Sequence, residues 1–378
     1  MRVAQVAPLY ESVPPRCYGG TERVVSWLTE ELVEQGHEVV LFASGDSLTK
    51  AKLISPCSRA LRLNPERVDP LACSILQLEQ LFRRIDSFDV VHFHIDNLHF
   101  PLCRRHRVAH VTTLHGRLDL LGLTALYHEF NDMPVVSISQ AQISPLPAIN
   151  WYGTVHHGLP LEKYRLSKQR GTYLAFLGRI CPEKGVARAI EIAKRFAMPL
   201  KIAAKVDETD RRYMEMEIRP LLNHPLVEFI GEISDEDKVG FLGNAYALVS
   251  PIDWPEPFGL VMIEAMACGT PTVAFRRGSV PEVIDDRITG YIVENVEEAV
   301  QALQRIEQFD RARCRHVFEA RFSSKRMAKD YVQIYERVIS DHATNQSVSG
   351  KNGIADPEKL AIRNGANCRP LNGGIPVR

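Results

Sequence analysis

The chain has 378 residues, of which 45% are hydrophobic, and its 46 basic and 46 acidic side chains give a formal net charge of +0. This length predicts about two ordinary domains with substantial cores, and the balanced charge gives no general attraction to nucleic acid or to anionic membranes. The 8 cysteines are scattered without a CxxC pair, a pattern typical of free thiols in a reducing cytoplasm and not of a disulfide framework or a zinc site.

The N-terminal half alternates predicted strands with helices. Its first residues carry one charge and a short apolar stretch, which is typical of a first strand at 2–7 and not of a signal peptide. A helix is expected at about 20–35, where Gly36 stops it. Further strands are expected at 38–43, 89–94, 108–114 and 134–138. Such alternation is typical of a parallel sheet covered by helices.

The same alternation begins again in the C-terminal half, after the polar stretch 161–171, which we interpret as a linker. Strands are expected at 172–177, 199–204, 227–230, 245–250 and 270–275, with a helix near 186–196. The predicted fold class is therefore α/β, with two doubly wound Rossmann-like domains, 1–160 and 161–323, facing a central cleft. In such sheets, ligands bind beyond the carboxyl ends of the strands.

The C-terminal segment differs in composition from the rest. A helix at about 324–340 is expected to close the fold, and residues 341–378, rich in Asn, Gly, Ser and Pro, are predicted to form a disordered tail. Because no apolar run approaches the ~18 residues that a membrane span needs, we expect a soluble, cytoplasmic protein.

Two glutamates, Glu256 and Glu264, flank the start of a helix predicted at about 258–269. Pro255 and Pro257 stiffen the backbone on either side of Glu256. Glu264 has only apolar neighbours three and four residues away, so its carboxylate lies on a face that ought to be buried, where a charge without a partner costs roughly several kcal/mol. The pair can therefore hold a polyhydroxylated ligand at the helix start. The alternative is that Glu264 pairs with a core arginine and that Glu256 is a solvated loop acid.

Two loops at predicted strand ends carry further signals. Gly19 and Gly20 open the first long helix, where they permit a tight turn and a close approach of backbone to a ligand, although paired glycines are also ordinary turn residues. Arg179 and Lys184 lie between a strand and a helix of the second half, where two cations can flank a diphosphate. The alternative for these two cations is a solvent-facing position.

Taken together, these segments resemble a known family. The resemblance rests on GlyGlyThrGlu at 19–22, on GlyArg and GluLysGly within 178–185, on GluProPheGly at 256–259 and on GluAlaMetAlaCysGlyThrPro at 264–271. In this order the segments resemble the group-1 glycosyltransferases, also called glycosyltransferase family 4, which are retaining enzymes of the GT-B fold. The resemblance covers about residues 1–340 and implies that fold and a hexosyltransferase activity.

The resemblance also implies roles for single residues. It implies that Glu256 binds hydroxyl groups of the donor sugar and that Glu264 binds the ribose hydroxyls of the nucleotide. The backbone amides of Phe258, Gly259 and Leu260 match amides that assist the first of these glutamates in the family.

On the other side of the predicted cleft, Gly19 and Gly20 match glycines that make room for the diphosphate, and His115 matches a histidine that reaches the donor sugar. Arg179 and Lys184 match the cations that stabilise the leaving diphosphate, so we expect them to be catalytic, together with His115 and Glu256 at the reacting sugar. Neither a nucleophile nor a metal ion is needed if the acceptor attacks from the face that the diphosphate leaves.

The implied function is transfer of a hexose from a UDP-, GDP- or ADP-linked sugar to a hydroxyl group of a carbohydrate, lipid-linked or small-molecule acceptor. It serves glycan, glycolipid or glycoside synthesis, with no cofactor and no nucleic-acid partner. Two alternatives stay open: a phosphorylase- or synthase-like enzyme of the same fold that acts on a small sugar acceptor, and a non-catalytic module that binds sugar nucleotides. The presence of Arg179, Lys184, Glu256 and Glu264 together argues against the module.

Three segments have competing interpretations. Ser279 stands in the loop 276–284 where the family usually has a glycine, so how closely this loop approaches the donor stays open. Trp254 either stacks on an acceptor sugar or packs at the surface. The Asp-x-Asp sequence at 235–237 resembles a metal motif of another glycosyltransferase fold, but we interpret it as a helix start capped by Ser234, because each acid in a first turn contributes about 0.3–1 kcal/mol.

The histidines His92, His94 and His99 suggest a metal site by their closeness in sequence, but no set of cysteine or carboxylate partners is evident, and metal binding is the less favoured interpretation. His94 and Asp96 are instead candidates for the acceptor site. The basic cluster 104–107 permits peripheral contact with anionic lipid or with a phosphorylated acceptor, although a solvated face is the simpler interpretation.

Overall fold

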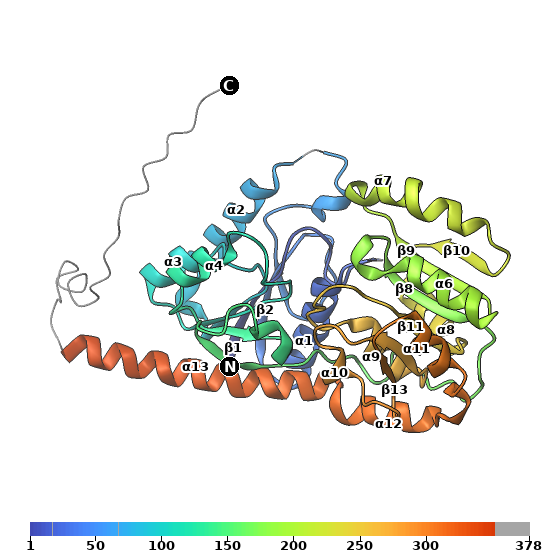
Figure 1. Cartoon of the computed structure of the whole chain (residues 1–378). Coiled ribbons are helices and arrows are strands. Elements are labelled where there is room, and N and C mark those ends of the chain that lie inside the picture. Colours follow the sequence, from blue (N-terminus) through green and yellow to red (C-terminus); the bar gives the residue numbers. More distant parts are fainter. Residues whose placement is uncertain (17, 67, 352–378) are drawn as a thin grey trace, which may run out of the picture.

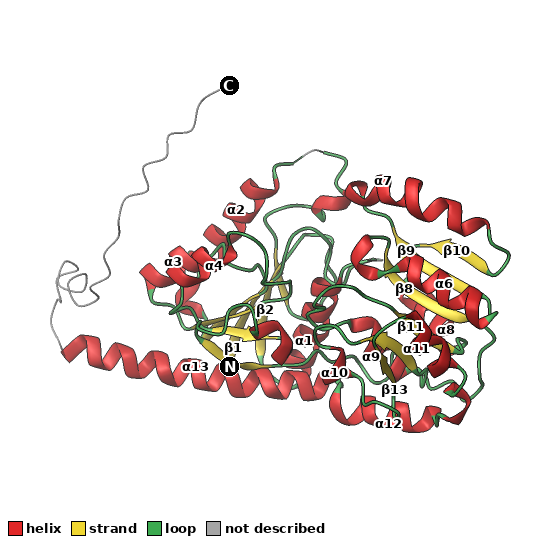
Figure 2. Ribbon diagram, in the orientation of Figure 1, coloured by secondary structure: helices red, strands yellow, loops and turns green. Residues whose placement is uncertain are grey.

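The structure, a computed structural model, describes residues 1–16, 18–66 and 68–351 of the chain. It contains two parallel β-sheets, each with helices packed against it (Figure 1), and this confirms the predicted α/β class. Figure 2 shows the strands in two separate groups, one formed by the first half of the chain and one by the second. The exact residues at which one domain ends and the next begins stay a prediction.

The first sheet has the strand order β3-β2-β1-β4-β5-β6-β7. Its strands are β1 (Arg2–Val6), β2 (Glu38–Phe42), β3 (Lys52–Ile54), β4 (Val90–Phe93), β5 (His110–Thr113), β6 (Val135–Ser137) and β7 (Trp151–Thr154). The helices of this half are α1 (Gly20–Glu34), α2 (Pro70–Phe82), α3 (Phe100–His106), α4 (Leu123–Glu129) and α5 (Gln140–Ile143). Every residue of β4 is buried, because helices cover both faces of a central parallel strand. The edge strands β3 and β7 are only partly buried, and the sequence did not predict them.

The second sheet has the order β10-β9-β8-β11-β12-β13. Its strands are β8 (Leu174–Arg179), β9 (Leu200–Lys205), β10 (Val227–Gly231), β11 (Ala247–Ser250), β12 (Thr272–Phe275) and β13 (Gly290–Val293). The helices of this half are α6 (Val186–Phe196), α7 (Arg211–Tyr213), α8 (Asp235–Gly243), α9 (Leu260–Ala267), α10 (Val280–Val283), α11 (Val296–Leu303) and α12 (Arg311–Arg321). The edge strand β13 was not predicted either, and two of its four residues are only partly buried.

The last helix, α13 (Ser324–Lys351), returns to the first sheet, where it lies beside α1, β4 and β5 (Figure 1). It is longer than predicted, because the first residues of the expected tail continue it. Asp341 accepts a hydrogen bond from Oη of Tyr152 at 2.9 Å and lies 3.7 Å from Nε of Arg337, and these contacts hold the helix beyond residue 340. The rest of the predicted tail, 352–378, lies outside the described residues.

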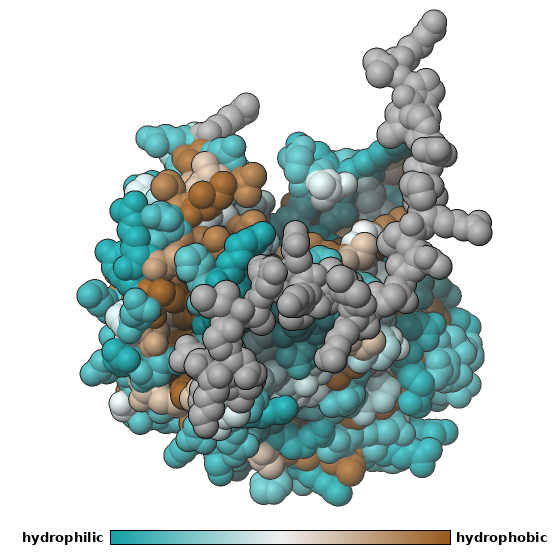
Figure 3. Space-filling view, turned by 90° about the vertical axis from the view of Figure 1, so that its left-hand side faces the viewer, coloured by the Kyte–Doolittle hydropathy of each residue, from teal (hydrophilic) through white to brown (hydrophobic). Residues whose placement is uncertain are grey.

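The surface is mainly hydrophilic, with apolar side chains gathered in patches on the face that Figure 3 shows. Three apolar side chains of α2 are exposed, those of Leu71, Ile75 and Leu76. Among the described helices, none combines the length and the apolar character that crossing a membrane requires.

The strand order of each sheet reverses beside its first strand, between β1 and β4 in one sheet and between β8 and β11 in the other. At such a point the loops beyond the carboxyl ends of the two neighbouring strands part, which leaves room for a ligand. The loops 7–19, 180–185 and 251–259 all leave strands at these positions. They carry five of the predicted site residues, Gly19, Lys184, Glu256, Phe258 and Gly259.

Candidate active site

A cavity of about 720 Å³ is lined by residues of both halves of the chain. Ten residues predicted to form the site line it, namely Gly19, Gly20, His115, Arg179, Lys184, Glu256, Phe258, Gly259, Leu260 and Glu264. The fold thus brings segments that are far apart in sequence to one place, at the carboxyl ends of β1, β5, β8 and β11.

Lys184 lies in the turn between β8 and α6, and its Nζ forms an ion pair with Oε2 of Glu256 at 2.5 Å. The same ammonium lies 5.0 Å from the centre of the Trp254 ring, in a cation–π contact. Burial opposes the charged form of the lysine, but the Glu256 carboxylate outweighs burial, so the pKa of Lys184 is raised. Lys184 is therefore a cation at neutral pH.

Arg179, the last residue of β8, faces two aspartates. Its Nη1 lies 3.3 Å from Oδ2 of Asp207 and 3.7 Å from Oδ2 of Asp210. Nζ of Lys205 lies 2.7 Å from the other carboxylate oxygen of Asp207. A polyanion that enters the cavity would compete with these aspartates for the guanidinium, because a diphosphate offers more charge to the same fork of N–H donors.

The loop that holds Glu256 is fastened by the neighbouring loop of Gly278 and Ser279. The backbone N–H of Ser279 donates to the Glu256 carbonyl at 2.9 Å, and its Oγ donates to the Phe258 carbonyl at 2.8 Å. Gly278 has a φ of 53°, and a Cβ at this position would collide with the backbone of Pro255 and Glu256. The serine that replaces the expected glycine therefore ties this loop directly to the Glu256 segment.

Two helices begin at the cavity. Gly259 precedes α9 with a φ of 81°, which favours glycine, and Gly19 precedes α1. A Cβ on Gly19 would lie 2.8 Å from Cβ of Pro15, and one on Gly20 would lie 3.5 Å from Cδ1 of Leu260, so the first turns of α1 and α9 are close neighbours. The first-turn amides of a helix have no partner within it, so both helix starts can donate hydrogen bonds to an anion between them.

Glu264 is 2% exposed and lines the cavity from α9. Its Oε1 accepts hydrogen bonds from Oη of Tyr164 at 3.1 Å and from Nζ of Lys238 at 3.2 Å. Burial opposes the charged form, but Lys238 and Arg23 outweigh burial, so the pKa of Glu264 is lowered. Glu264 is thus a buried carboxylate with a charge, hydrogen-bonded to a lysine and a tyrosine, and the buried Arg23 also stabilises that charge, as the alternative interpretation expected of a core arginine.

The Asp-x-Asp segment begins α8. Oγ of Ser234 accepts a hydrogen bond from the backbone N–H of Asp237 at 3.2 Å, which confirms the predicted helix cap. Asp235 forms ion pairs with Lys163 and with Arg23. Because Arg23 belongs to α1, this cluster joins the two halves of the molecule beside the cavity.

His115 is held by a chain of buried polar side chains that ends on α13. Its Nε2 lies 2.8 Å from Nδ1 of His94, and Nε2 of His94 lies 2.8 Å from Oε1 of Gln5. Nε2 of Gln5 donates to Oη of Tyr335 at 2.9 Å. Burial lowers the pKa of His94 and lowers that of His115 to about 3, so both rings are neutral.

These contacts assign the tautomers of the two rings. An amide oxygen only accepts, so Nε2 of His94 carries the proton that Gln5 binds, and Nδ1 of His94 is an acceptor. The donor to that nitrogen is then Nε2 of His115. Nδ1 of His115 is left as a hydrogen-bond acceptor.

The two candidates for the acceptor site lie in different surroundings. His94 is 2% exposed and lies behind His115. Asp96 is exposed, with a φ of 54°, in the loop that follows β4. Neither side chain lines the cavity, although His94 contacts His115, which does.

The three histidines of the segment 92–99 do not form one cluster. His92 joins the chain of buried side chains, with Nδ1 2.8 Å from Oη of Tyr335 and Nε2 2.7 Å from Oγ1 of Thr113. His99 lies on the other face of the sheet, with Nε2 2.7 Å from Oγ1 of Thr112. Neighbouring residues of a strand point to opposite faces of the sheet. Thr112 and Thr113 are neighbours on β5, so the histidines that contact them lie on opposite faces.

The cavity also has lining residues that the sequence did not indicate. They include Tyr18, Lys205, Asp207, Glu232 and Lys238. Trp254, for which two interpretations were open, also lines the cavity, and its ring lies 5.4 Å from the Arg117 guanidinium as well as beside Lys184. A signal for Lys238 is its place one turn into the helix that Ser234 caps. The remaining side chains reach the cavity through tertiary packing, for which a single sequence holds no pattern.

Two family models match the chain. Residues 162–319 match the one described as "Glycosyl transferases group 1", and residues 18–190 match the one described as "Glycosyltransferase Family 4". N-acetyl-alpha-D-glucosaminyl L-malate synthase of Bacillus anthracis is 25% identical over 377 residues, which cover 86% of this chain and 96% of that protein.

Two solved structures are similar over nearly their whole length. AviGT4, a glycosyltransferase involved in avilamycin A biosynthesis, has a TM-score of 0.67 and 25% identity, with 90% of this chain and 98% of that chain covered. The Anabaena protein HepE, solved in complex with UDP and glucose, has a TM-score of 0.70 and 15% identity, with 89% and 100% covered, and shows the fold alone.

Proposed function

Since the chain belongs to the group-1 glycosyltransferases and has the GT-B fold, we propose that it is a retaining, metal-independent hexosyltransferase. In this proposal it moves a hexose from a nucleoside diphosphate to a hydroxyl group of an acceptor. The observation that carries the proposal is the convergence of Arg179, Lys184 and the first turns of α1 and α9 on one cavity.

The diphosphate is the group that this positive wall fits. Arg179 and Lys184 flank it, and the first-turn amides of α1 and α9 complete the set of donors. As the bond to the sugar breaks, negative charge grows on the phosphate oxygens, and fixed cations lower the barrier because they require no reorganisation at that moment. Lys184 is suited to this role, since the Glu256 carboxylate raises its pKa and keeps it charged.

The sugar and the nucleoside occupy the two ends of the cavity in this proposal. Glu256 binds sugar hydroxyls with its Oε1, because its Oε2 is held by Lys184, and the amides of Phe258, Gly259 and Leu260 assist it. Glu264 binds the ribose hydroxyls with Oε2, because its Oε1 takes the hydrogen bonds of Tyr164 and Lys238. Both carboxylates bind and orient the donor.

Retention follows if the acceptor attacks from the face that the diphosphate leaves. The bond between the anomeric carbon and the phosphate oxygen breaks while the bond to the acceptor oxygen forms, and the acceptor proton passes to a phosphate oxygen. The products are the glycoside and the nucleoside diphosphate. No covalent sugar–enzyme intermediate is needed, and Glu256 is poorly placed for one because it is paired with Lys184.

His115 binds the sugar in this proposal, and His94 positions His115. Nδ1 of His115, left as an acceptor by the contact with His94, binds a hydroxyl group of the donor sugar. His94 is therefore a positioning residue in this proposal and not part of the acceptor site. Asp96, exposed beyond β4, is retained as the candidate acceptor residue.

The test is isothermal titration with a panel of UDP-, GDP- and ADP-linked sugars, coupled to an assay of slow donor hydrolysis. The panel includes N-acetylglucosamine donors with L-malate as acceptor, because the name of the Bacillus anthracis relative contains both groups. We expect one class of donor to bind and to release its nucleoside diphosphate slowly in water and faster with a suitable acceptor. Binding without hydrolysis or transfer would favour a non-catalytic module, and no binding by any donor would contradict the proposal.

A further inference from the structure

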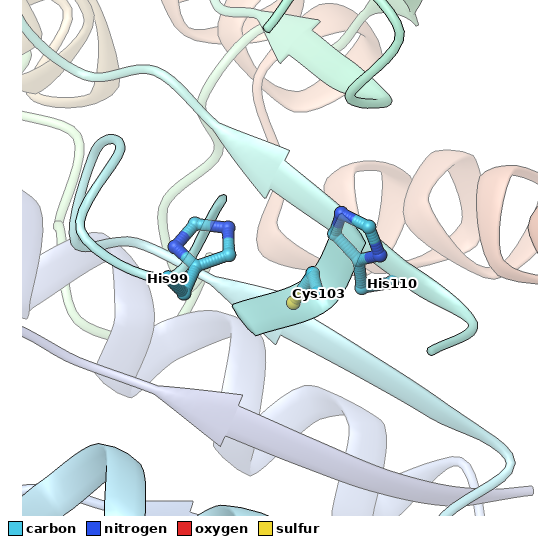
Figure 4. Close-up of side chains that lie close together, drawn as sticks. All are labelled: His99, Cys103 and His110. Atoms are coloured by element: carbon cyan, nitrogen blue, oxygen red, sulfur yellow. The ribbon is translucent and has the colours of Figure 1, made fainter. Parts of the chain in front are cut away.

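His99, Cys103 and His110 form a buried cluster at the first sheet, on the face opposite to the one where His92 lies. One ligand atom from each, an imidazole nitrogen or the thiol sulfur, lies within 4.8 Å of the other two. Figure 4 shows the Cys103 side chain between the two imidazole rings. His99 is the residue that precedes α3, Cys103 lies one turn further along that helix, and His110 begins β5. None of the three lines the cavity described above.

Each of the two rings uses one nitrogen atom in a hydrogen bond, which leaves the other one to bind a ligand. Nδ1 of His110 donates to the Val108 carbonyl at 2.8 Å, which places the proton on Nδ1 and a lone pair on Nε2. Nε2 of His99 lies 2.7 Å from Oγ1 of Thr112, which leaves Nδ1 for the cluster. Metal-binding histidines characteristically donate their second N–H in this way, to a carbonyl or another acceptor.

Each of the two rings has one nitrogen atom without a hydrogen-bond partner. Nδ1 of His99 and Nε2 of His110 are both buried and accept no hydrogen bond from the described part of the chain. The residues themselves are 0% and 5% exposed, and Cys103 is 2% exposed. A buried polar atom without a partner is costly, so two of them on the histidines of one buried cluster call for an explanation.

We propose that His99 Nδ1, His110 Nε2 and Cys103 Sγ bind a zinc ion. Two imidazole nitrogens and one thiolate are the ligands that Zn²⁺ takes in proteins, and a fourth position completes a tetrahedron. Atoms that lie within 4.8 Å of one another are at most about 2.8 Å from a common centre, so zinc–nitrogen and zinc–sulfur bonds of about 2.0–2.3 Å require each ligand atom to move inward by less than about 1 Å. The ion would join the start of α3 to β5 and so fix the loop that follows β4.

Zinc binding takes one proton from the protein. A thiol ordinarily carries its proton at neutral pH, and the hydrogen bond from Nδ1 of His110 to the Val108 carbonyl leaves Nε2 of that ring with a lone pair. The reaction is therefore Cys–SH plus Zn²⁺ giving Cys–S–Zn and H⁺, with the proton released to solvent. The two histidines bind as they stand, because neutral imidazole is the metal ligand.

The test starts from full-length protein that has been reduced and treated with a chelator, to which zinc chloride alone is added. We expect one zinc per chain by elemental analysis, release of about one proton in weak buffer, and a rise of the melting temperature by roughly 5–10 °C at about 100 times the dissociation constant. Mg²⁺ and Ca²⁺ prefer oxygen ligands and should produce none of these effects.

Cobalt substitution keeps the proposal testable without any mutation. Co²⁺ bound at this site should show the near-ultraviolet charge-transfer band of a cobalt–thiolate bond and the visible bands of tetrahedral cobalt. A protein that binds neither metal, or that binds cobalt without the thiolate band, would overturn the proposal.

Variants then locate the ion. Cys103→Ser and His110→Gln should each lower zinc occupancy at least tenfold and remove the rise in melting temperature. The matched control is Cys314→Ser, which removes another fully buried thiol, one that donates to the Ile288 carbonyl. Zinc that stays bound in Cys103→Ser, or that is lost in Cys314→Ser, would place the ion elsewhere and contradict the assignment.

Discussion

The Nζ of Lys184 and the Oε2 of Glu256 form an ion pair at 2.5 Å, so the cation assigned to the leaving diphosphate is bound to the carboxylate assigned to the sugar. The pair joins the turn after β8 to the loop after β11, across the switch point of the second sheet. Each partner sets the electrostatic environment of the other, so a change in one alters both functions. The pH dependence of activity can reveal this coupling.

Substitution of Glu256 by glutamine should move the alkaline limb of the activity profile. We expect kcat/KM to fall about 10–100-fold, which corresponds to one hydrogen bond to a charged group. The limb should also shift to lower pH, because the raised pKa of Lys184 depends on the Glu256 carboxylate. The measurement is kcat/KM from pH 7 to 10, with Glu228→Gln as a control, since that glutamate pairs with Lys201 away from the cavity. An unchanged alkaline limb would mean that the pair does not govern activity.

Glu264→Gln should weaken donor binding more than it slows turnover. We expect KM for the donor to rise about 10–100-fold with kcat changed only a few-fold, because the ribose is remote from the bond that breaks. A donor lacking one ribose hydroxyl provides the control. The unmodified enzyme should bind it more weakly than the normal donor, whereas Glu264→Gln should bind both about equally. If the variant still discriminates fully, Glu264 is not the ribose ligand.

His94 should act only through His115. His94→Gln should lower kcat/KM about tenfold, and adding the same change to His115→Ala should lower it little further, because the second ring then has nothing left to orient. His128→Gln, an exposed change on α4, is the matched control. Fully additive losses in the double variant would show that His94 acts on its own, for example at the acceptor.

The folded protein should lose stability as the pH falls below about 6.5. Burial lowers the folded-state pKa of His92, His94, His115 and His157, so the unfolded chain binds protons that the folded chain refuses. Once the pH is low enough to protonate the imidazoles of the unfolded chain, each such histidine lowers the free energy of unfolding by about 1.4 kcal/mol per pH unit. Urea midpoints at pH 7.5, 6.5 and 5.5 measure this loss, with His128→Gln as the control. A midpoint independent of pH over this range would show that these rings are protonated in the folded state.

The central strands and the motif residues were predictable from the sequence for physical reasons. Strands such as β4 and β11 are buried on both faces and therefore read as short apolar runs. Gly259 and Gly19 mark helix starts where the backbone takes a conformation that favours glycine. Glu264 was recognisable as a charged residue among apolar neighbours.

The partners of those residues were not predictable, because they depend on packing between distant segments. Lys238 reaches Glu264 from another helix, and Arg23 reaches Asp235 from the other half of the chain. The length of α13 was also missed, since its end is held by Tyr152 of an edge strand and not by its own sequence. The buried contact between His94 and His115 joins residues just beyond the ends of the neighbouring strands β4 and β5, which no spacing in the sequence indicates.

The most direct test of the proposed mechanism is the rate of donor hydrolysis by Lys184→Ala, measured with the donor that binds best. We expect a fall of about 10²–10⁴-fold, because the cation that faces the leaving diphosphate is gone, with circular dichroism and melting temperature close to those of Lys201→Ala, which removes a partly buried lysine on β9 away from the cavity. Hydrolysis and transfer within a few-fold of the unmodified enzyme in a folded Lys184→Ala would contradict the proposed mechanism.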